Sequence, residues 1–409
     1  MPEALTVIYL VYMFLALYFL MLFTVLFAQN RKEIFSFPKA KNKYSVSVLI
    51  PAFNEEDSIE GTVKSVLNSD YKYIEEVIVI NDGSTDNTLK IVRELEKKYS
   101  KVKVLDKVNE GNKGAALNYA IPYVKGDLIA VVDADSYPDK NALSTMTGYF
   151  DDKDVGVVTT SILVRDRNNF LRKMQAIEYK VIAFTRKLLD FVDSIYVTPG
   201  PLALYNKKIL KKIGGFDTKN LTEDIEATWH MLHDGYKVRM SFISKSTTVA
   251  PNTIKKWIKQ RIRWTIGGIQ CIIKYKNVLF RKGMLGYFII PFFAFSLVLG
   301  VFGLGIFFYR ILRGFLSYYL TTNYSLASQT AIIVLQDINL NPSILNFLGI
   351  ILFLLGVGFT YFSISFINSH IKEKENFFSV VFYLLVYILL TPLVLIVAVY
   401  KLSRKKYSW

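Results

Sequence analysis

Two apolar ends enclose a charged middle, and this division constrains the fold of the chain more than any other feature of the sequence. Before Gln29 the only charged residue is Glu3, and from Met284 to Trp409 there are eleven charged residues. The stretch between these ends holds 42 basic and 30 acidic residues, as a soluble domain would. The pattern therefore excludes an ordinary soluble protein and a chain that lies wholly within a membrane. An aromatic content of 15% excludes a disordered chain, and the single cysteine, Cys271, excludes a disulfide framework and a cysteine-based zinc site.

The first apolar run covers residues 5–28 and carries no charge. A membrane-spanning helix needs about 20 such residues, whereas the apolar core of a cleaved signal peptide has about 7–15. The run also lacks a basic start and a small-residue cleavage site. Arg31 and Lys32 follow it directly, so the positive-inside rule places the residues after it in the cytosol. We therefore predict an N-terminal transmembrane helix over 1–28 and a linker over 29–44.

The C-terminal region, 284–409, is predicted to contain three or four further spans. The candidate runs are 285–309, 315–335, 344–368 and 377–400. The run 315–335 is rich in Ser, Thr, Asn and Tyr, so it is either a span that lines a polar path or an external loop. The basic tail around Lys401 and Arg404 prefers the cytosol, which favours four C-terminal spans. The protein is thus expected to be an integral protein of the plasma membrane with a cytosolic polar domain.

The segment 254–282 holds nine cations and no acid, with Trp and Ile residues mixed among them. Such a composition is typical of a basic amphipathic helix that lies at a membrane interface and contacts anionic lipids. The alternative is a simple basic flank that stops membrane insertion. We predict amphipathic interfacial helices over 251–283. Because this excess of positive charge stands beside a predicted span, membrane lipid explains it better than nucleic acid does, and no nucleic-acid partner is expected.

The polar domain alternates strand-like and helix-like segments. The strand-like segments are 45–50, 76–80, 102–105 and 127–132, and the helix-like segments between them are 57–67, 87–99 and 113–124. This alternation predicts an α/β domain with a mainly parallel sheet and helices on both faces. In such sheets, ligands bind beyond the carboxyl ends of the strands. No GxGxxG follows a strand and no GxxxxGK[ST] occurs, which argues against a dinucleotide-dependent oxidoreductase and a Walker-type NTPase.

Polar residues follow three of these strands: Asn54 and Glu55, then Asp82, then Asp133 and Asp135. Two carboxylates one residue apart at a strand end can share a hard cation. Mg²⁺ prefers a few carboxylates together with substrate phosphates, and it would neutralise a diphosphate leaving group. The alternative for the last pair is an ordinary turn in which an aspartate caps the chain.

Two further motifs carry candidate chemistry. Thr222-Glu223-Asp224 begins a predicted helix over 222–234, where Asp224 could act as a general base that deprotonates an acceptor hydroxyl. The plainer interpretation is acid enrichment at a helix start, with Thr222 as the N-cap. In the second motif, helical spacing places Gln260, Arg263 and Trp264 on one face, with Arg261 pointing elsewhere. That face offers an amide, a guanidinium suited to diphosphate and an indole on which a sugar can stack, although a Trp/Arg pair can also be an interfacial anchor.

Together and in this order, Asp82, Asp133-x-Asp135, Thr222-Glu223-Asp224 and Gln260-x-x-Arg263-Trp264 resemble the processive inverting family 2 glycosyltransferases. These are the cellulose, chitin, hyaluronan and poly-N-acetylglucosamine synthases, and the resemblance covers residues 45–270. It implies a GT-A catalytic domain over 45–250, a UDP-sugar donor and Mg²⁺ or Mn²⁺ as cofactor. The stretch that contains Gly200, Pro201 and Tyr205 is similar to hyaluronan and chitin synthases, whereas the last two motifs are more similar to poly-N-acetylglucosamine synthases. UDP-N-acetylglucosamine is the donor common to these candidates.

The resemblance also assigns roles to residues. The implied substrate-binding residues are Pro51, Ala52, Asn54 and Glu55 in the first nucleotide loop, Asp82 at the uracil, Lys113 near the nucleotide, Asp133 near the diphosphate, and Gly200 and Pro201 near the acceptor. The implied metal ligands are Asp133 and Asp135. The implied catalytic residues are Glu223, Asp224 as the base, Gln260, Arg263 at the diphosphate and Trp264 under the acceptor sugar.

Three functions remain open from the sequence. The first is a processive membrane synthase that extends a β-linked polysaccharide and exports it through its own spans. The second is a non-processive enzyme that glycosylates a membrane lipid. The third is a non-enzymatic scaffold or transporter, which the few apolar runs and the spacing of the polar motifs disfavour.

Overall fold

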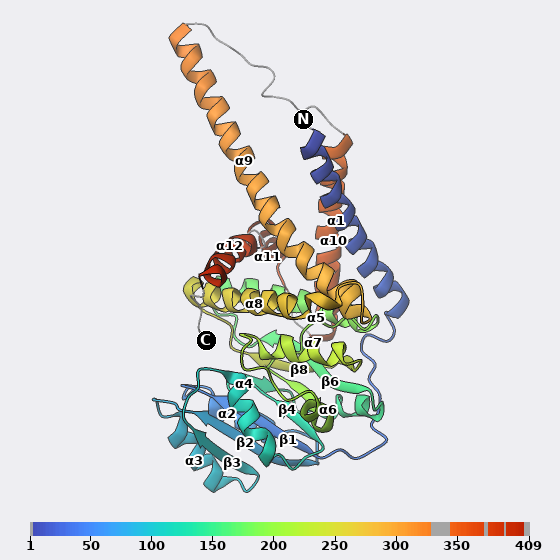
Figure 1. Cartoon of the computed structure of the whole chain (residues 1–409), viewed down its shortest axis with the longest axis vertical. Helices are drawn as coiled ribbons and strands as arrows, with labels where there is room; N and C mark the ends of the chain where they lie inside the picture. Colours follow the sequence, from blue (N-terminus) through green and yellow to red (C-terminus); the bar gives the residue numbers. More distant parts are fainter. Residues whose placement is uncertain (1–2, 329–343, 372–374, 388–389, 405–409) are drawn as a thin grey trace.

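The computed structural model describes residues 3–328, 344–371, 375–387 and 390–404. An α/β layer lies at one end of the molecule, and a group of long helices rises from the opposite end (Figure 1). The linker after the first helix runs along the α/β layer. There the backbone N–H of Lys41 and the side chain of Asn42 donate hydrogen bonds to Asp151, at 2.7 and 2.8 Å.

Eight strands form one mixed sheet with the order β3-β2-β1-β4-β7-β6-β8-β5. The strands are β1 (Val46–Ala52), β2 (Ile74–Asp82), β3 (Val102–Lys107), β4 (Leu128–Val131), β5 (Ser136–Pro138), β6 (Val155–Val164), β7 (Ala203–Asn206) and β8 (Lys237–Thr248). Strands β1 to β4 are parallel, as predicted, and β6 pairs in parallel with β8. The short β7 runs antiparallel to both of its neighbours, and β5 runs antiparallel to β8.

Helices cover both faces of the sheet, which confirms the predicted α/β class. Alternate residues of a strand point to opposite faces. In β1, Leu49 packs into the cluster under α4 (Lys113–Ala120) and α5 (Phe170–Asp190), while Val48 and Ile50 pack into the cluster under the helices of the other face. The latter helices are α2 (Ile59–Leu67) and α3 (Thr88–Lys98). Because both faces are buried, the strands are continuous apolar runs rather than alternating ones.

Two helices carry the last two motifs. Helix α7 (Glu223–His233) begins directly after Thr222, at the predicted position. Thr222 does not cap it with its side chain, because its hydroxyl donates instead to Asn220 at 3.1 Å. Helix α8 (Ile254–Tyr275) lies between the α/β layer and the rising helices, and buries Trp257, Ile262 and Ile266 among other side chains. It contacts α7 on one side and α12 (Leu390–Ser403) on the other.

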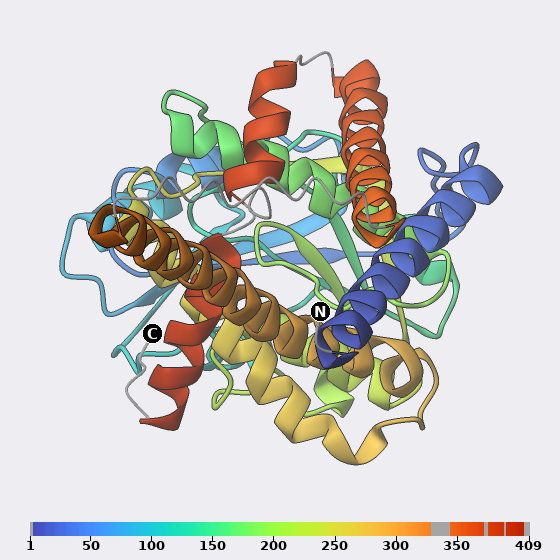
Figure 2. The same ribbon diagram turned by 90° about the horizontal axis from the view of Figure 1, so that it is seen from above.

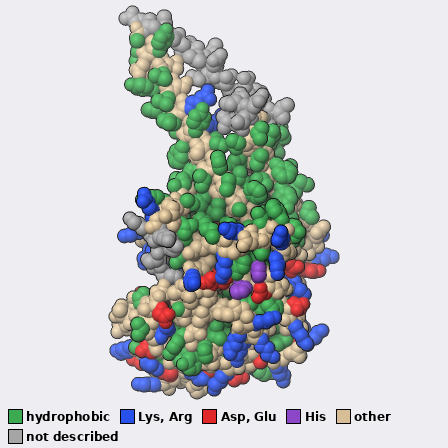
Figure 3. Space-filling model, viewed as in Figure 1, with side chains coloured by type: hydrophobic (Ala, Val, Ile, Leu, Met, Phe, Trp, Pro, Cys, Tyr) green, Lys and Arg blue, Asp and Glu red, His purple; other side chains and the backbone are tan. Residues whose placement is uncertain are grey.

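Four helices are long and apolar enough to cross a membrane, within the part of the chain that the structure describes. They are α1 (Glu3–Asn30), α9 (Ile290–Ser328) with the π-turn Leu285–Ile289 before it, α10 (Ile344–Ile371), and the segment that joins α11 (Phe377–Phe382), the π-turn Tyr383–Tyr387 and α12. Seen from above, α1 and α10 lie beside each other, and α9 crosses near the end of α1 (Figure 2). Aromatic rings join these helices, such as Phe27 to Phe362 at 5.0 Å and Phe19 to Phe292 at 5.1 Å. Hydrophobic side chains cover this end of the molecule, while Lys, Arg, Asp and Glu gather over the α/β layer (Figure 3).

The run 315–335 does not begin a separate helix. Its described part, up to Ser328, continues α9, whose 39 residues extend for about 58 Å, whereas the apolar core of a bilayer is about 30 Å thick. The remainder of that run lies outside the described residues. Three C-terminal candidate spans are thus present among the described residues, the smaller of the two predicted numbers.

Candidate functional site

The predicted acidic residues gather at the carboxyl edge of the sheet. Asp82 ends β2, and Asp133 and Asp135 follow β4, two strands that flank β1 on either side. The backbone N–H of Asp133 donates to the carbonyl oxygen of Gly200 at 3.0 Å, so the loop before β7 closes over this edge. The chain thus brings together motifs that lie more than 60 residues apart in the sequence.

Lys113, the first residue of α4, joins two of these motifs. Its Nζ lies 2.5 Å from Asp133 Oδ1 and 2.8 Å from Glu223 Oε1. Burial alone would lower the pKa of the Lys113 ammonium, but Asp133, Glu223 and Asp224 together raise it well above its usual value. A β-carbon at Gly200 would stand 2.5 Å from Asp133 Oδ1 and would also collide with the ammonium. A side chain at position 200 would therefore force the Lys113 ammonium or the Asp133 carboxylate to shift.

Asp224 lies in the first turn of α7, half-buried beside this cluster. Burial and the neighbouring Glu223 raise the pKa of Asp224 to about 6, while Lys113 and Arg263 act to lower it. A carboxylate with a pKa near neutrality is suited to accept a proton from a hydroxyl. Arg263 is therefore close enough to Asp224 to influence its ionisation, which brings the two separate motifs together.

Asp135 and Glu55 form a second acidic pair at the same edge. Burial, with the neighbouring charges of Asp133 and Glu55, raises the pKa of Asp135 to about 7. Asp135 accepts hydrogen bonds from the hydroxyls of Ser136 and Thr248, at 3.0 and 3.2 Å. Burial also raises the pKa of Glu55, and so does Asp133. The three carboxylates thus disfavour one another's ionisation.

The first nucleotide loop follows β1, in which Pro51 and Ala52 are the last two residues. Asn54 has a φ of 55°, and its Oδ1 accepts from the backbone N–H of Thr85 at 2.8 Å. This bond ties the loop after β1 to the loop after β2. Asp82 is 6% exposed and accepts from Lys107 Nζ at 2.8 Å, so a ligand there would contact a carboxylate that is already paired.

On α8, Gln260, Arg263 and Trp264 lie on the side that the helical spacing predicted. The side-chain oxygen Oε1 of Gln260 is buried and accepts no hydrogen bond from any described residue. Trp264 packs against a buried cluster that includes Tyr179 on α5, residues of β6, and Ala250 just after β8. A buried amide oxygen without a donor beside an indole is consistent with a site for a polar ligand. Pro201 stands apart from them, and its carbonyl oxygen accepts from the Ser246 hydroxyl at 3.0 Å.

Contrary to the prediction, Arg261 does not point away from the motif: it lies three residues before Trp264 on α8, covers one face of that ring and holds α8 in place. Its Nη2 lies 2.6 Å from Glu178 Oε2 on α5, and both side chains are largely buried. The guanidinium also stands over the Trp264 ring, 4.2 Å from the centroid, so one face of that indole is covered. Tyr387, in the π-turn before α12, donates to Glu178 at 2.8 Å and accepts from the Trp257 indole N–H at 2.6 Å. A buried network therefore connects the Trp264 ring to an apolar segment near the C-terminus.

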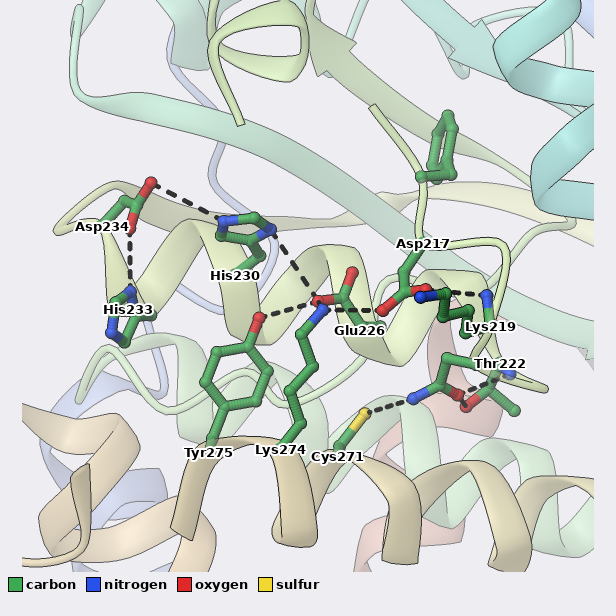
Figure 4. A network of polar contacts seen from close by, with 12 residues as sticks. Asp217, Lys219, Thr222, Glu226, His230, His233, Asp234, Cys271, Lys274 and Tyr275 are labelled. Carbon is green, nitrogen blue, oxygen red and sulfur yellow. Dashed lines mark hydrogen bonds and ion pairs between the residues drawn. The ribbon is translucent and has the colours of Figure 1, made fainter. Parts of the chain in front are cut away.

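A second network ties α7 to α8 on the other side (Figure 4). The buried carboxylate of Glu226 accepts from Lys274 at 2.5 Å and from the Tyr275 hydroxyl at 2.7 Å. Lys274 also contacts Asp217 at 2.7 Å, and Asn220 donates to the sulfur of Cys271 at 3.2 Å. These contacts fix α8 against α7, and they thereby keep Arg263 on α8 close to Asp224 on α7.

Sequence reasoning did not identify Glu178 and Tyr179 as site residues. Burial raises the pKa of Tyr179 to about 12, and Asp135 and Arg263 are among the charges that act on it. Tyr179 therefore borders the site. Arg186 lies seven residues after Tyr179 on α5 and is also buried. No motif signals these positions, because their role depends on which face of α5 meets the sheet.

Residues 47–214 match the family model described as glycosyl transferase family 2. These residues form a family 2 glycosyltransferase domain. The chain is 32% identical over 231 residues to the poly-beta-1,6-N-acetyl-D-glucosamine synthase of Staphylococcus epidermidis and 30% identical to that of Staphylococcus aureus strain MSSA476. Each alignment covers 56% of this chain and 56% of the relative, so the chain matches little more than half the length of these relatives.

The fold is shared with the mannosyltransferase PcManGT from Pyrobaculum calidifontis, whose structure was determined in complex with GDP-Man and Mn²⁺. The TM-score is 0.54 with 21% sequence identity, over 73% of this chain and 86% of the other. The predicted GT-A architecture is thereby confirmed, and the resemblance to processive family 2 glycosyltransferases of the poly-N-acetylglucosamine type is supported by the relatives.

Proposed function

We propose that the protein is a membrane-embedded inverting glycosyltransferase that uses UDP-N-acetylglucosamine to extend a β-linked polysaccharide. The observation that carries the proposal is the cluster of Lys113, Asp133, Glu223 and Asp224 at the carboxyl edge of the sheet, with Arg263 close to Asp224. This arrangement combines a base of suitable pKa with cations for a diphosphate. The names of the similar staphylococcal synthases support N-acetylglucosamine as the sugar.

The donor would lie across the carboxyl ends of β1, β2 and β4. Its nucleoside would contact the loop of Pro51, Ala52, Asn54 and Glu55 and the carboxylate of Asp82, and its diphosphate would approach Lys113 and Arg263. Guanidinium and ammonium groups are the usual partners of diphosphate oxygens. Gly200 leaves room for the diphosphate beside Asp133, where any side chain would intrude.

Asp133 and Asp135 would hold a divalent cation, Mg²⁺ or Mn²⁺. Among the described residues no group of three or more His, Cys, Asp or Glu side chains could hold a metal ion, so the donor phosphates would complete the coordination that these two carboxylates begin. The raised pKa of Asp135 fits such a site, because mutual repulsion of carboxylates is what a cation offsets. When bound, the cation would neutralise charge that develops on the departing diphosphate.

The reaction is a single displacement at the anomeric carbon. Asp224 takes the proton of an acceptor hydroxyl, whose oxygen forms the new glycosidic bond as the bond to the UDP oxygen breaks. Arg263 and Lys113 stabilise the negative charge on the leaving UDP. Gln260 would donate or accept a hydrogen bond at the sugar, and the open face of Trp264 would stack under the acceptor. Glu223 acts indirectly, since it raises the pKa of Asp224 and pairs with Lys113.

The apolar helices support a location in the plasma membrane with the catalytic domain on the cytosolic side, where UDP-sugars are made. Helix α8 would lie at the interface, with the exposed residues Lys255, Lys256 and Lys259 beside anionic lipid headgroups. A growing polymer that leaves Trp264 would enter the region between α8 and the rising helices. Export through these helices is the processive form of the proposal, and transfer of one sugar to a lipid is the alternative.

The experiment is to incubate the purified full chain, in lipid nanodiscs, with a panel of UDP-sugars and Mg²⁺ or Mn²⁺, and to measure UDP release and product mass. The proposal expects UDP release with UDP-N-acetylglucosamine and a product of many sugar units. A product of one added sugar on a lipid would establish the alternative, and no consumption of any UDP-sugar would refute both.

A further inference from the structure

Arg186 is a buried arginine whose charge is not balanced by a direct partner. It lies near the end of α5 and is 4% exposed. No hydrogen bond or ion pair joins it to any residue that the structure describes, and its Nε is a buried donor without an acceptor. The next residue, Lys187, is buried to a similar degree but is fully paired, with Asp190 Oδ2 at 2.7 Å and the carbonyl oxygen of Met240 at 3.0 Å. A buried charge without a partner costs free energy, and buried polar groups normally have hydrogen-bond partners. The unpaired Arg186 is therefore a candidate to bind a ligand.

Arg186 lies on the face of α5 that also carries Tyr179. Arg186 is seven residues after Tyr179, so the two side chains share one helix face about 10 Å apart. Tyr179 belongs to the cluster against which Trp264 packs. The face of α5 therefore runs from the proposed acceptor platform towards Asp224. In agreement, burial lowers the pKa of Arg186, while Tyr196 and Asp224 are the two groups close enough to raise it.

Tyr196 lies where the α/β layer meets α9. Its ring centroid lies 4.9 Å from that of Phe293, and its carbonyl oxygen accepts from the Trp229 indole N–H at 3.1 Å. The hydroxyl of Tyr196 makes no hydrogen bond with the described residues. An unpaired guanidinium and an unpaired phenol thus lie between Asp224 and the first turn of α9.

We propose that the Arg186 guanidinium and the Tyr196 hydroxyl form an acceptor subsite, which hydrogen-bonds oxygens of the sugar unit behind the one that Asp224 deprotonates. This inference rests on the proposed glycosyl transfer and specifies its acceptor as a saccharide. The guanidinium has five N–H donors in a fixed plane, which suits the hydroxyl and carbonyl oxygens of a sugar.

The local balance of charge argues for a neutral ligand. Asp224 is the carboxylate close enough to act on Arg186. An acceptor phosphate at Arg186 would therefore lie beside the carboxylate that has to take the proton. A neutral saccharide adds no negative charge there, and Arg186 then continues to favour the ionised form of Asp224.

The test uses the full chain in nanodiscs with UDP-N-acetylglucosamine as donor and N-acetylglucosamine oligosaccharides as acceptors. The variants are R186M, R186K, Y196F and, as matched control, K187M. We expect R186M to raise the KM for the oligosaccharide at least tenfold while the KM for the donor changes less than twofold. R186K should recover part of that loss, and Y196F should raise the acceptor KM about threefold. Oligosaccharide binding, followed by tryptophan fluorescence without donor, should weaken in the same order.

Stability distinguishes a ligand-binding role from a structural one. R186M removes an unpaired buried charge, so its melting temperature should equal or exceed that of the wild type. K187M breaks a buried pair, so it should melt at a lower temperature without a selective change in the acceptor KM. Equal changes of both KM values in R186M, no change in either, or a loss confined to phosphate-bearing lipid acceptors would overturn the subsite. If the wild type binds oligosaccharide through Arg186 but transfers no sugar, the proposed function fails and the subsite stands.

Discussion

Replacing Arg261 by methionine tests whether the buried pair with Glu178 positions the Trp264 indole. The two side chains are 10% and 15% exposed and their charged atoms are 2.6 Å apart. Removal of one partner leaves the other charge buried, which costs about 3–5 kcal/mol. For a protein of this size, that loss should lower the melting temperature by about 5–10 °C. Glu178→Gln should cost a similar amount, because it leaves the guanidinium without its carboxylate.

The double variant, E178Q with R261M, separates stability from function. Both charges are then gone, so the loss of stability should be smaller than the sum of the two single losses by about 2 kcal/mol or more. Sugar transfer should not recover, because Arg261 also covers one face of the Trp264 ring at 4.2 Å. The assay is thermal melting in detergent followed by tryptophan fluorescence, together with UDP release at varied acceptor concentration.

The control for this experiment is the solvent-exposed pair Glu60 and Lys64 on α2, 2.6 Å apart. Glu60→Gln should leave the melting temperature and the acceptor KM as in the wild type, since exposed pairs contribute little. Additive single losses for Glu178 and Arg261 would refute a coupled pair. Full recovery of transfer in the double variant would refute the positioning of Trp264 by Arg261.

Three further predictions concern the cluster at the sheet edge. Because burial and Glu223 raise the pKa of Asp224 to about 6, kcat should fall about tenfold per pH unit below that value, as the base becomes protonated, and should level off above it in a pH–rate profile. Lys113→Met removes a cation that lowers the pKa of Asp224, so the acid limb of the same profile should move to higher pH; a limb that stays in place would contradict this. Gly200→Ala introduces a β-carbon about 2.5 Å from Asp133 Oδ1, so UDP release should drop at least about 100-fold, and transfer near the wild-type rate would show that the loop can move aside.

Part of the architecture could be predicted from the sequence because it depends on local signals. The first four strands are continuous apolar runs that end in turn residues, and they form β1 to β4 within a few residues of the predicted bounds. The carboxyl ends of parallel strands meet at one edge, so Asp82 and Asp133 could be placed near each other before the structure was known. The spacing of Gln260, Arg263 and Trp264 likewise sufficed to place them on one side of a helix.

The rest depends on pairings between distant residues that leave no periodic trace. The antiparallel β7 has only four residues, and its direction is set by its neighbours β4 and β6. Glu178 and Arg261 are 83 residues apart, and no feature of either segment predicts that they form an ion pair. That Arg186 has no direct partner can be known only from the tertiary structure, because it depends on all the segments that pack against α5. For the run 315–335, lack of charge indicated a span but could not show that its described part prolongs α9.

The central claim, sugar transfer with Asp224 as the base, is tested most directly by Asp224→Asn in the full chain with UDP-N-acetylglucosamine. The matched control is Asp234→Asn, which alters an acid at the other end of α7. The account predicts that D224N lowers the rate of polymer formation by about 10²–10⁴-fold at pH 7.5 while it remains folded, and that D234N does not. Polymer formation by D224N at the wild-type rate would contradict the account.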